Sequence, residues 1–476
     1  MKLLKHATAA FTANTVTAGA QYALVVLVAR GLGPDAFGGF VFALAFGSLV
    51  AVLPNFGLDR ILVRQVVRDR AAASSWFAAA GTLRLGLAVA AIAVAALLLP
   101  ALVPAGQSTT AAFLIVLSLI LALAAELCRS ALYASEALTF ETALRLAGRA
   151  LTLGLAATAV VFGRSLRALG VALAVAAAIE AAVYLQATVR RLRLHWERPV
   201  AATVRAVVVG AAPIACSTLF VLLYFRANVL LLTAYAGTEA AGQFGAAFTF
   251  LQALQVASGS LAAVLLPHFV QREGDGAGAL RTRIDTATRV LLAAAVPAAA
   301  TLALLAPEIV QLVYSSRYAG AVPVLAVLAW AAVFMFMGSL HGSLLIALDD
   351  ERVVFWLSLA AAIFSLAANV LLIGPFGVIG ASWVTVATEA LVGLTCLILV
   401  RRRTGAPRLS AVAWPAAIAA AVAVLVVSPA AALPLAVRGL LALGVITAVL
   451  IWIRLTAGTV WSGVWQALGA RGSVGA

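Results

Sequence analysis

Residues 21–46 read QYALVVLVARGLGPDAFGGFVFALAF, two apolar helices separated by a Gly-Pro-Asp break. The pattern returns 204 positions later, Gly237 standing against Gly33, where residues 225–250 read FRANVLLLTAYAGTEAAGQFGAAFTF. The second copy repeats small and aromatic positions of the first, with Gly33, Ala36, Gly38, Phe40, Ala43 and Phe46 matched by Gly237, Ala240, Gly242, Phe244, Ala247 and Phe250. An apolar hairpin repeated at half the chain length indicates two similar helical bundles, and such repeats are typical of secondary transporters.

The composition excludes an ordinary soluble protein. Among 476 residues, 64% are hydrophobic and 10% are charged, and many apolar runs reach the roughly 20 residues that a membrane helix needs. The net charge of +15 does not indicate nucleic-acid binding, because Lys and Arg concentrate in alternate loops as the positive-inside rule requires. The three cysteines lie in apolar segments without metal-ligand spacing, so no metal site and no cofactor are expected.

We expect an all-α polytopic membrane protein with about fourteen transmembrane helices. Two repeated six-helix lobes, 1–195 and 196–404, are expected to surround a central cavity, and residues 405–476 add two accessory helices and a cytoplasmic tail. The basic linker at 190–199, RRLRLHWERP, is the expected lobe boundary. The expected spans are 10–30, 37–57, 76–99, 111–134, 143–162, 168–189, 203–235, 239–265, 288–313, 321–347, 352–373, 377–400, 411–428 and 435–455.

The distribution of basic residues also predicts the orientation of the chain. The loops at 59–70, 190–199 and 401–408 are rich in arginine, so we expect them in the cytoplasm together with both termini. The uncharged exit of the third span, PALVPAGQSTT at 100–110, is expected outside. We expect a multi-pass protein of an inner-type membrane; the resemblance described next implies the bacterial inner membrane.

Three motifs in order resemble the polysaccharide flippases of the multidrug/oligosaccharidyl-lipid/polysaccharide exporter superfamily. They are VARGLGPDAFGGFVFALAF at 28–46, DRILVRQVVRD at 59–69 and LLYFRANVLLLTAYAG at 222–237. The resemblance covers the first twelve spans. It implies two lobes around a cavity and transport, by alternating access, of an oligosaccharide linked to undecaprenyl diphosphate for O-antigen, capsule or exopolysaccharide synthesis. Membrane lipids and polysaccharide polymerase machinery are the further partners that it implies.

The seventh span departs from the family pattern. Members commonly carry Tyr-x-Arg-x-Asp there, whereas this chain has Tyr224, Arg226 and Asn228. Asn228 retains a hydrogen-bonding group but does not titrate, which puts ion coupling through this position in doubt. Coupling to H⁺ or Na⁺ is therefore left open.

Arg226 is the leading candidate substrate ligand. It lies about nine residues from the outer end of its span, or about 13 Å deep at 1.5 Å per residue. A charge at that depth costs roughly 3 kcal/mol on insertion scales, and a planar guanidinium suits a diphosphate. The alternative is a packing charge paired with a buried Glu or a carbonyl.

Further charged residues are weighed in the same way. Arg30 and Arg84 are candidate substrate ligands, although Arg30 could simply reach the headgroups. Arg60 and Arg64 could receive headgroups at the inner face, or simply obey the positive-inside rule. Glu180 and Glu389 stand near the middle of the last helix of each lobe, in the similar segments GVALAVAAAIEAAV and GASWVTVATEALV. They are ion-coupling candidates or structural ion-pair partners. Glu126 is a third coupling candidate, but its spacing to Arg129 also permits a helical ion pair.

Three function classes compete at this stage. A flippase explains the repeat and the intramembrane arginines. A drug or cation antiporter of the same superfamily would favour an acidic, aromatic cavity. A membrane polysaccharide polymerase or ligase would need a large outer loop, and the longest expected outer turn has only about a dozen residues. We therefore expect a transporter rather than an enzyme.

Overall fold

The structure is a computed structural model, and it describes residues 2–59, 62, 73–134, 138–192, 201–265, 277–348 and 350–407, with isolated positions between 434 and 447. Every regular element among these residues is a helix, so the expected all-α fold is confirmed. The two expected accessory helices fall largely outside the described residues, as do Arg60 and Arg64.

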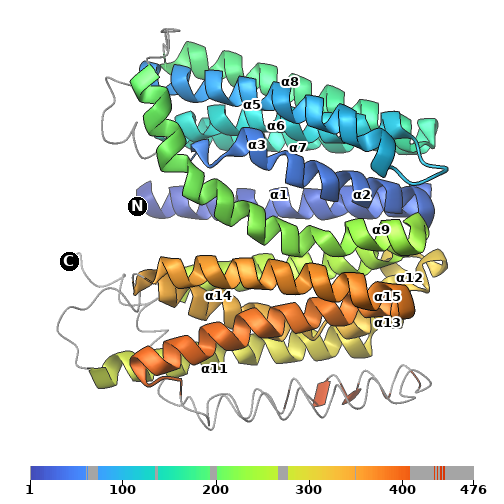
Figure 1. Cartoon of the computed structure of the whole chain (residues 1–476), viewed down its shortest axis with the longest axis vertical. Helices are drawn as coiled ribbons and strands as arrows, with labels where there is room; N and C mark the ends of the chain where they lie inside the picture. Colours follow the sequence, from blue (N-terminus) through green and yellow to red (C-terminus); the bar gives the residue numbers. More distant parts are fainter. Residues whose placement is uncertain are drawn as a thin grey trace. The chain divides into compact units, whose positions relative to one another are not determined.

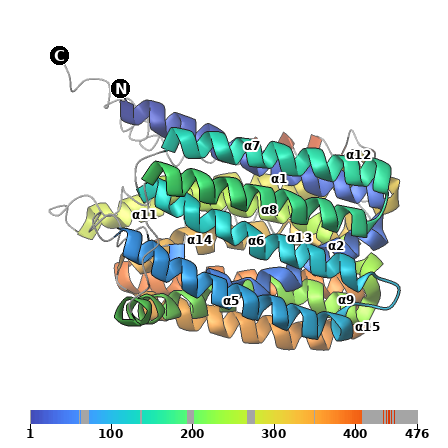
Figure 2. The same cartoon turned by 90° about the horizontal axis from the view of Figure 1, so that it is seen from above.

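The chain forms two compact units, the first made of Met1–Gly245 and Asn369–Val378. Helix α6 packs against α8, α1 packs against α7, and α2 packs against α6. Figure 2 shows α5, α6, α7 and α8 as nearly parallel helices. The elements of this unit are α1 (Lys2–Leu32), α2 (Pro34–Val50), α3 (Val52–Asn55), α5 (Ala73–Leu102), α6 (Thr109–Ala134), α7 (Leu138–Thr158), the π-helical turn η1 (Ala159–Gly163), α8 (Leu166–Leu192) and the first part of α9 (Ala201–Leu265).

The second unit comprises Ala246–Ala368 and Ile379–Ala476. Within it α11 packs against α14, and Figure 1 shows α11, α13, α14 and α15 running in similar directions. Its described elements are the end of α9, α11 (Ala277–Leu304), α12 (Ala306–Tyr314), the 3₁₀ turn η2 (Ser316–Tyr318), α13 (Ala321–Leu328), α14 (Ala331–Ala347) and most of α15 (Glu351–Thr404).

Helices α9 and α15 are each two membrane crossings joined at a glycine. Gly237 breaks α9 with φ 87° and Gly377 breaks α15 with φ 54°; these left-handed angles are accessible to glycine at little cost. Seven further spans have single-crossing length, and the short apolar helix Val16–Leu32 adds one. The described residues therefore supply twelve crossings, in the order that the apolar runs predict.

Small and aliphatic side chains fill the helix interfaces. In the first unit Leu62, Phe77, Leu132 and Tyr184 pack together with several alanines. In the second unit Gly393 approaches the Phe334 carbonyl so closely that a Cβ at Gly393 would stand 2.5 Å from that oxygen. Such backbone approach is the usual basis of helix association in a bilayer, where the hydrophobic effect does not draw helices together.

Candidate functional site

Arg226 lies in the first part of α9, eleven residues before the Gly237 break. At 1.5 Å per residue this is about 16 Å along the helix. Its Nε is buried and has no hydrogen-bond partner within the described part of the chain. The ring centroids of Tyr224 and Phe225, the two preceding residues, are 4.2 Å apart. A guanidinium inside a membrane helix with an unused donor is chemically equipped to bind an anion.

Asn228 lies two residues further along α9 and joins this helix to α15. Its Oδ1 accepts a hydrogen bond of 2.6 Å from Nδ2 of Asn369, and both side chains are buried. The pair is neutral, so it crosses the helix interface without the desolvation cost of an ion pair. The sequence identified Asn228 but missed Asn369, for which the only available signal was an amide in the middle of an apolar span.

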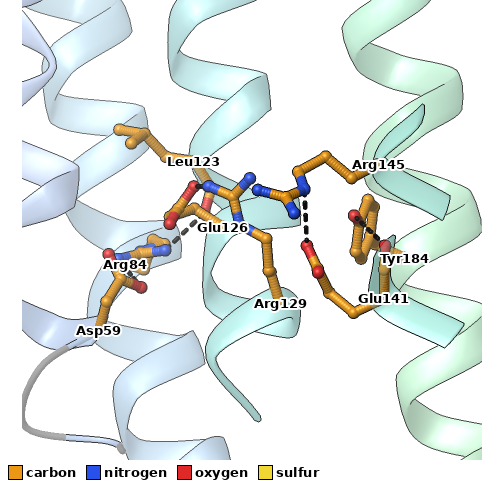
Figure 3. Close-up of polar contacts among 8 residues, drawn as sticks. All are labelled: Asp59, Arg84, Leu123, Glu126, Arg129, Glu141, Arg145 and Tyr184. Atoms are coloured by element: carbon orange, nitrogen blue, oxygen red, sulfur yellow. Dashed lines mark hydrogen bonds and ion pairs between the residues drawn. The ribbon is translucent and has the colours of Figure 1, made fainter. Parts of the chain in front are cut away.

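Arg84, in contrast, is fully engaged by neighbouring protein groups. Its Nε donates to the Pro54 carbonyl at 3.1 Å, one terminal nitrogen donates to the Leu123 carbonyl, and the other forms an ion pair of 2.9 Å with Asp59. Arg84 is 4% exposed. Figure 3 shows its guanidinium beside the Asp59 carboxylate. The guanidinium therefore ties α3, α5 and α6 together.

Two further ion pairs lie in the same unit (Figure 3). Arg129 pairs with Glu126 one turn earlier on α6. On α7 the Nε of Arg145 stands 3.5 Å from Oε1 of the fully buried Glu141. Tyr184 of α8 lies within electrostatic range of Glu141, Arg129 and Arg145, so α6, α7 and α8 share one charged cluster. Asp59 and Glu141 were the partners that the sequence did not assign.

The remaining predicted site residues are dispersed. Arg30 is exposed in the last turn of α1. Glu180 is half-buried on α8, where its carboxyl group touches the Cβ position of Gly148. Glu389 is 4% exposed on α15, and its Oε1 has no hydrogen-bond partner among the described residues. The predicted roles of these residues in binding or coupling stay predictions.

The two copies of the repeated hairpin meet each other within the first unit. Gly33 and Gly237 adopt the same backbone angles, φ 84° and ψ 173° against φ 87° and ψ 175°. A Cβ at Gly38 would stand 1.8 Å from the Thr238 carbonyl oxygen, and a Cβ at Gly242 would stand 2.0 Å from the Pro34 carbonyl oxygen. In each copy, a glycine thus lies directly against a first-turn carbonyl group of the other copy. A residue with a Cβ at Gly38 or Gly242 would clash with that carbonyl.

A polar contact accompanies this backbone contact. The Asp35 carboxylate accepts a hydrogen bond from the Thr238 hydroxyl and one of 2.8 Å from Nε2 of Gln107. Asp35 stands in the first turn of α2, where a carboxylate is favoured by the helix dipole. The sequence showed an acidic residue at the break in each hairpin. It did not indicate that Asp35 of the first hairpin would contact Thr238 of the second.

Comparison with known families and structures places these features in context. The family model described as polysaccharide biosynthesis protein matches residues 27–323. The model described as lipid II flippase MurJ matches residues 237–453. No curated protein matches the chain by sequence. The second of these descriptions names a flippase, which is a transporter.

Solved structures share the fold at low sequence identity. The lipid II flippase MurJ in an inward closed conformation matches with a TM-score of 0.75 and 11% identity, covering 93% of this chain and 98% of that one. An inward-facing multidrug resistance MATE family transporter of the MOP superfamily matches with a TM-score of 0.64 and 16% identity, covering 81% and 94%. An outward-facing one matches with a TM-score of 0.55 and 14% identity, covering 82% and 92%.

These matches agree with the expected membrane fold and extend over nearly the whole chain. The nine apolar spans among the described residues, two of them of double length, make this a multi-pass membrane protein. Because the first family model covers more than half of the sequence, the chain belongs to the polysaccharide biosynthesis protein family, and its expected kinship with the flippases of the MOP superfamily is confirmed.

Proposed function

We propose that the protein is a flippase that moves an oligosaccharide linked to a polyprenyl diphosphate, such as undecaprenyl diphosphate, from the inner to the outer leaflet of the bacterial inner membrane. The observation that carries this proposal is Arg226, whose buried Nε has no hydrogen-bond partner in the described part of the chain. Arg84, in the same unit, is held by two carbonyls and a carboxylate. A buried arginine donor that has no acceptor among the described residues at membrane depth is best explained by an acceptor that arrives with the substrate.

The chemistry of the substrate divides it between two environments. The sugar and the diphosphate need a shielded polar path, because hydrocarbon cannot satisfy their hydrogen bonds. The polyprenyl tail gains nothing from burial in protein, so it stays in the bilayer while the headgroup crosses. Arg226 compensates the diphosphate charge with a planar fork of donors. Arg84 acts in this proposal as a framework residue rather than as a ligand.

Turnover requires a headgroup cavity that opens alternately to the two sides of the membrane. The hairpin contact around Gly38 and Gly242 is suited to close the opening on one side, because it joins the two repeats by close backbone packing and by the hydrogen bonds of Asp35. On the orientation that the basic loops predict, this is the outer side. Headgroup binding must remain moderate, since a ligand that favours one state too strongly prevents the return step.

The decisive experiment substitutes Arg226. The readout is the amount of lipid-linked glycan accessible at the outer leaflet of cells lacking the chromosomal copy, normalised to membrane-inserted protein. Arg226→Ala is expected to abolish export, whereas Arg226→Lys retains part of it, because the charge survives without the bidentate geometry. Val209→Ala, at a 65% exposed position of the same helix, is the matched control. Full export by stably inserted Arg226→Ala would exclude this arginine as a substrate ligand.

A second experiment tests the hairpin contact as a gate. Cysteines at positions 35 and 238, in a background lacking the three native cysteines, should form a disulfide readily and stop export until reduced. Gly38→Ala should weaken this cross-link because its methyl group meets the Thr238 carbonyl. Gly259→Ala, where nothing lies within 4 Å, is the control. Unimpaired export by the fully cross-linked protein would contradict gating at this contact.

A drug or cation antiporter is the second candidate, because solved MATE family transporters share the fold. That function predicts efflux of organic cations and no accumulation of lipid-linked glycan after gene deletion. Identification of the accumulated lipid therefore separates the two candidates and names the glycan.

A further inference from the structure

Glu389 is a buried acidic group of α15 for which the described residues supply no ion pair. It lies twelve residues after the Gly377 break and fifteen before the end of α15 at Thr404, or about 18 Å and 22 Å along the helix. Both values place the carboxyl group near the middle of its crossing. A polar group at this depth is outside the reach of either headgroup layer.

The side chain is buried, and no counter-charge is paired with it among the residues that the structure describes. Glu389 is 4% exposed, and Oε1 is buried without a hydrogen-bond partner. Within the described ranges it forms no ion pair, whereas Asp59, Glu126 and Glu141 each have an arginine. An ionised carboxylate in this setting carries a desolvation cost of several kcal/mol. The neutral acid avoids that cost.

The threonines nearest to Glu389 along α15 do not stabilise an ionised carboxylate. Thr385, one turn earlier, donates its hydroxyl proton to the Ala381 carbonyl at 2.9 Å, and Thr388 donates to the Val384 carbonyl at 2.8 Å. Each hydroxyl has one proton to donate. Because a backbone carbonyl takes that proton, neither threonine donates it to the Glu389 carboxyl group.

In the described ranges, the helices packed on this part of α15 form no ion pair with Glu389. On α14, His341 is fully buried and bonds to the Met337 carbonyl and Thr288, and Gly342 beside it faces Cys396, two turns beyond Glu389. On α11 the charged groups Arg281, Arg283, Asp285 and Arg289 lie towards its first half. The residues at 246–265 of α9 carry no titratable side chain.

We propose that Glu389 is a proton-binding site: it holds a proton in the conformation described here and releases that proton to water when a conformational change opens its environment. The release is the dissociation of the carboxylic acid to a carboxylate, and rebinding from water in the next half-cycle restores the acid. Raising the pH therefore favours the conformation that has released the proton. The use of this exchange to drive transport rests on the proposed flippase function.

The proton site is tested by infrared spectroscopy of the purified full-length protein in liposomes at neutral pH. The carbonyl stretch of a protonated carboxyl group should appear in the wild type and disappear in Glu389→Gln. Glu180→Gln, at the corresponding position of the other lobe, should retain the band. Persistence of the full band in Glu389→Gln would overturn the proposal. If Glu389→Gln does not insert, Glu389→Asp serves instead, and an unshifted band has the same consequence.

Two further arms separate the alternatives. Replacing choline by Na⁺ should leave the band unchanged; a loss of the band in Na⁺ would make this a sodium site and overturn the proton assignment. Addition of undecaprenyl diphosphate should release protons from the wild type but not from Glu389→Gln. If the band is present and undecaprenyl diphosphate does not bind, the flippase function fails while the proton site stands. If it binds and releases no proton from Glu389, coupling at this site is excluded.

Discussion

The first and the second unit differ in how they hold buried acidic side chains inside the membrane. In the first unit Asp59 and Glu141 are matched by Arg84 and Arg145 on the same or a neighbouring helix. In the second unit Glu389 has no matched arginine among the described residues. A buried ion pair offsets part of the desolvation cost of its two charges, and removing one partner leaves the other as an uncompensated charge. An unpaired charge destabilises the fold and persists only where its ligand, a proton or an anion, matters to function.

The largest effect is expected at the Asp59–Arg84 pair, and it tests the framework side of this contrast. Arg84→Met should lower the free energy of unfolding by about 3 kcal/mol, because it leaves a largely buried carboxylate without a counter-charge. The double variant Asp59→Asn with Arg84→Met should recover part of that loss. Reversible unfolding in detergent micelles is the measurement, with the exposed Arg167→Met as control. Equal stability of Arg84→Met and wild type would break the contrast.

Neutralising one buried acid in each unit should distinguish paired acids from unpaired acids. Glu141→Gln removes the charge beside Arg145 and should cost about 1–2 kcal/mol. Glu389→Gln replaces a neutral acid by a neutral amide of the same shape, so the free energy of unfolding should change little. The same unfolding measurement applies to both. A loss at Glu389→Gln as large as that at Glu141→Gln would indicate that Glu389 is ionised and paired.

The smallest effect is expected at the neutral pair of Asn228 and Asn369. A double-mutant cycle with alanine at each position should give a coupling energy of about 0.6 kcal/mol, the average for hydrogen bonds between membrane helices. A coupling energy of several kcal/mol would indicate an ionic network at this position. The Asn228–Asn369 pair would then no longer differ in strength from the ion pairs of the same unit.

The apolar runs and the glycine breaks were sufficient to predict the order and type of the first twelve helices. Gly33 and Gly237 marked both hairpin breaks, because a repeated glycine beside an acidic residue signals the end of an apolar helix. Ion pairs within one helix could also be predicted from the sequence, and the pair of Glu126 with Arg129 is confirmed. These features depend on spacing along one helix.

Contacts between distant helices were not predictable from one sequence. Asp59 lies 25 positions from Arg84, and Asn228 lies 141 positions from Asn369. Hydropathy shows which positions are polar, but the rotation of each helix decides which neighbour a side chain meets. In a uniformly apolar helix the hydrophobic pattern does not fix that rotation. Arg84 was for this reason grouped with Arg226 as a substrate ligand, although the structure surrounds it with protein acceptors.

The reciprocal contact of Gly38 and Gly242 has a consequence for how such a chain can diverge after duplication. Each glycine rests on a carbonyl of the opposite copy, at Thr238 and at Pro34, so neither copy is free to acquire a side chain there by itself. Change at one position is tolerated only when the opposite backbone retreats, and that retreat alters the second contact as well. Substitutions at Gly38 and Gly242 are therefore coupled. A comparison of related sequences should show these two positions varying together.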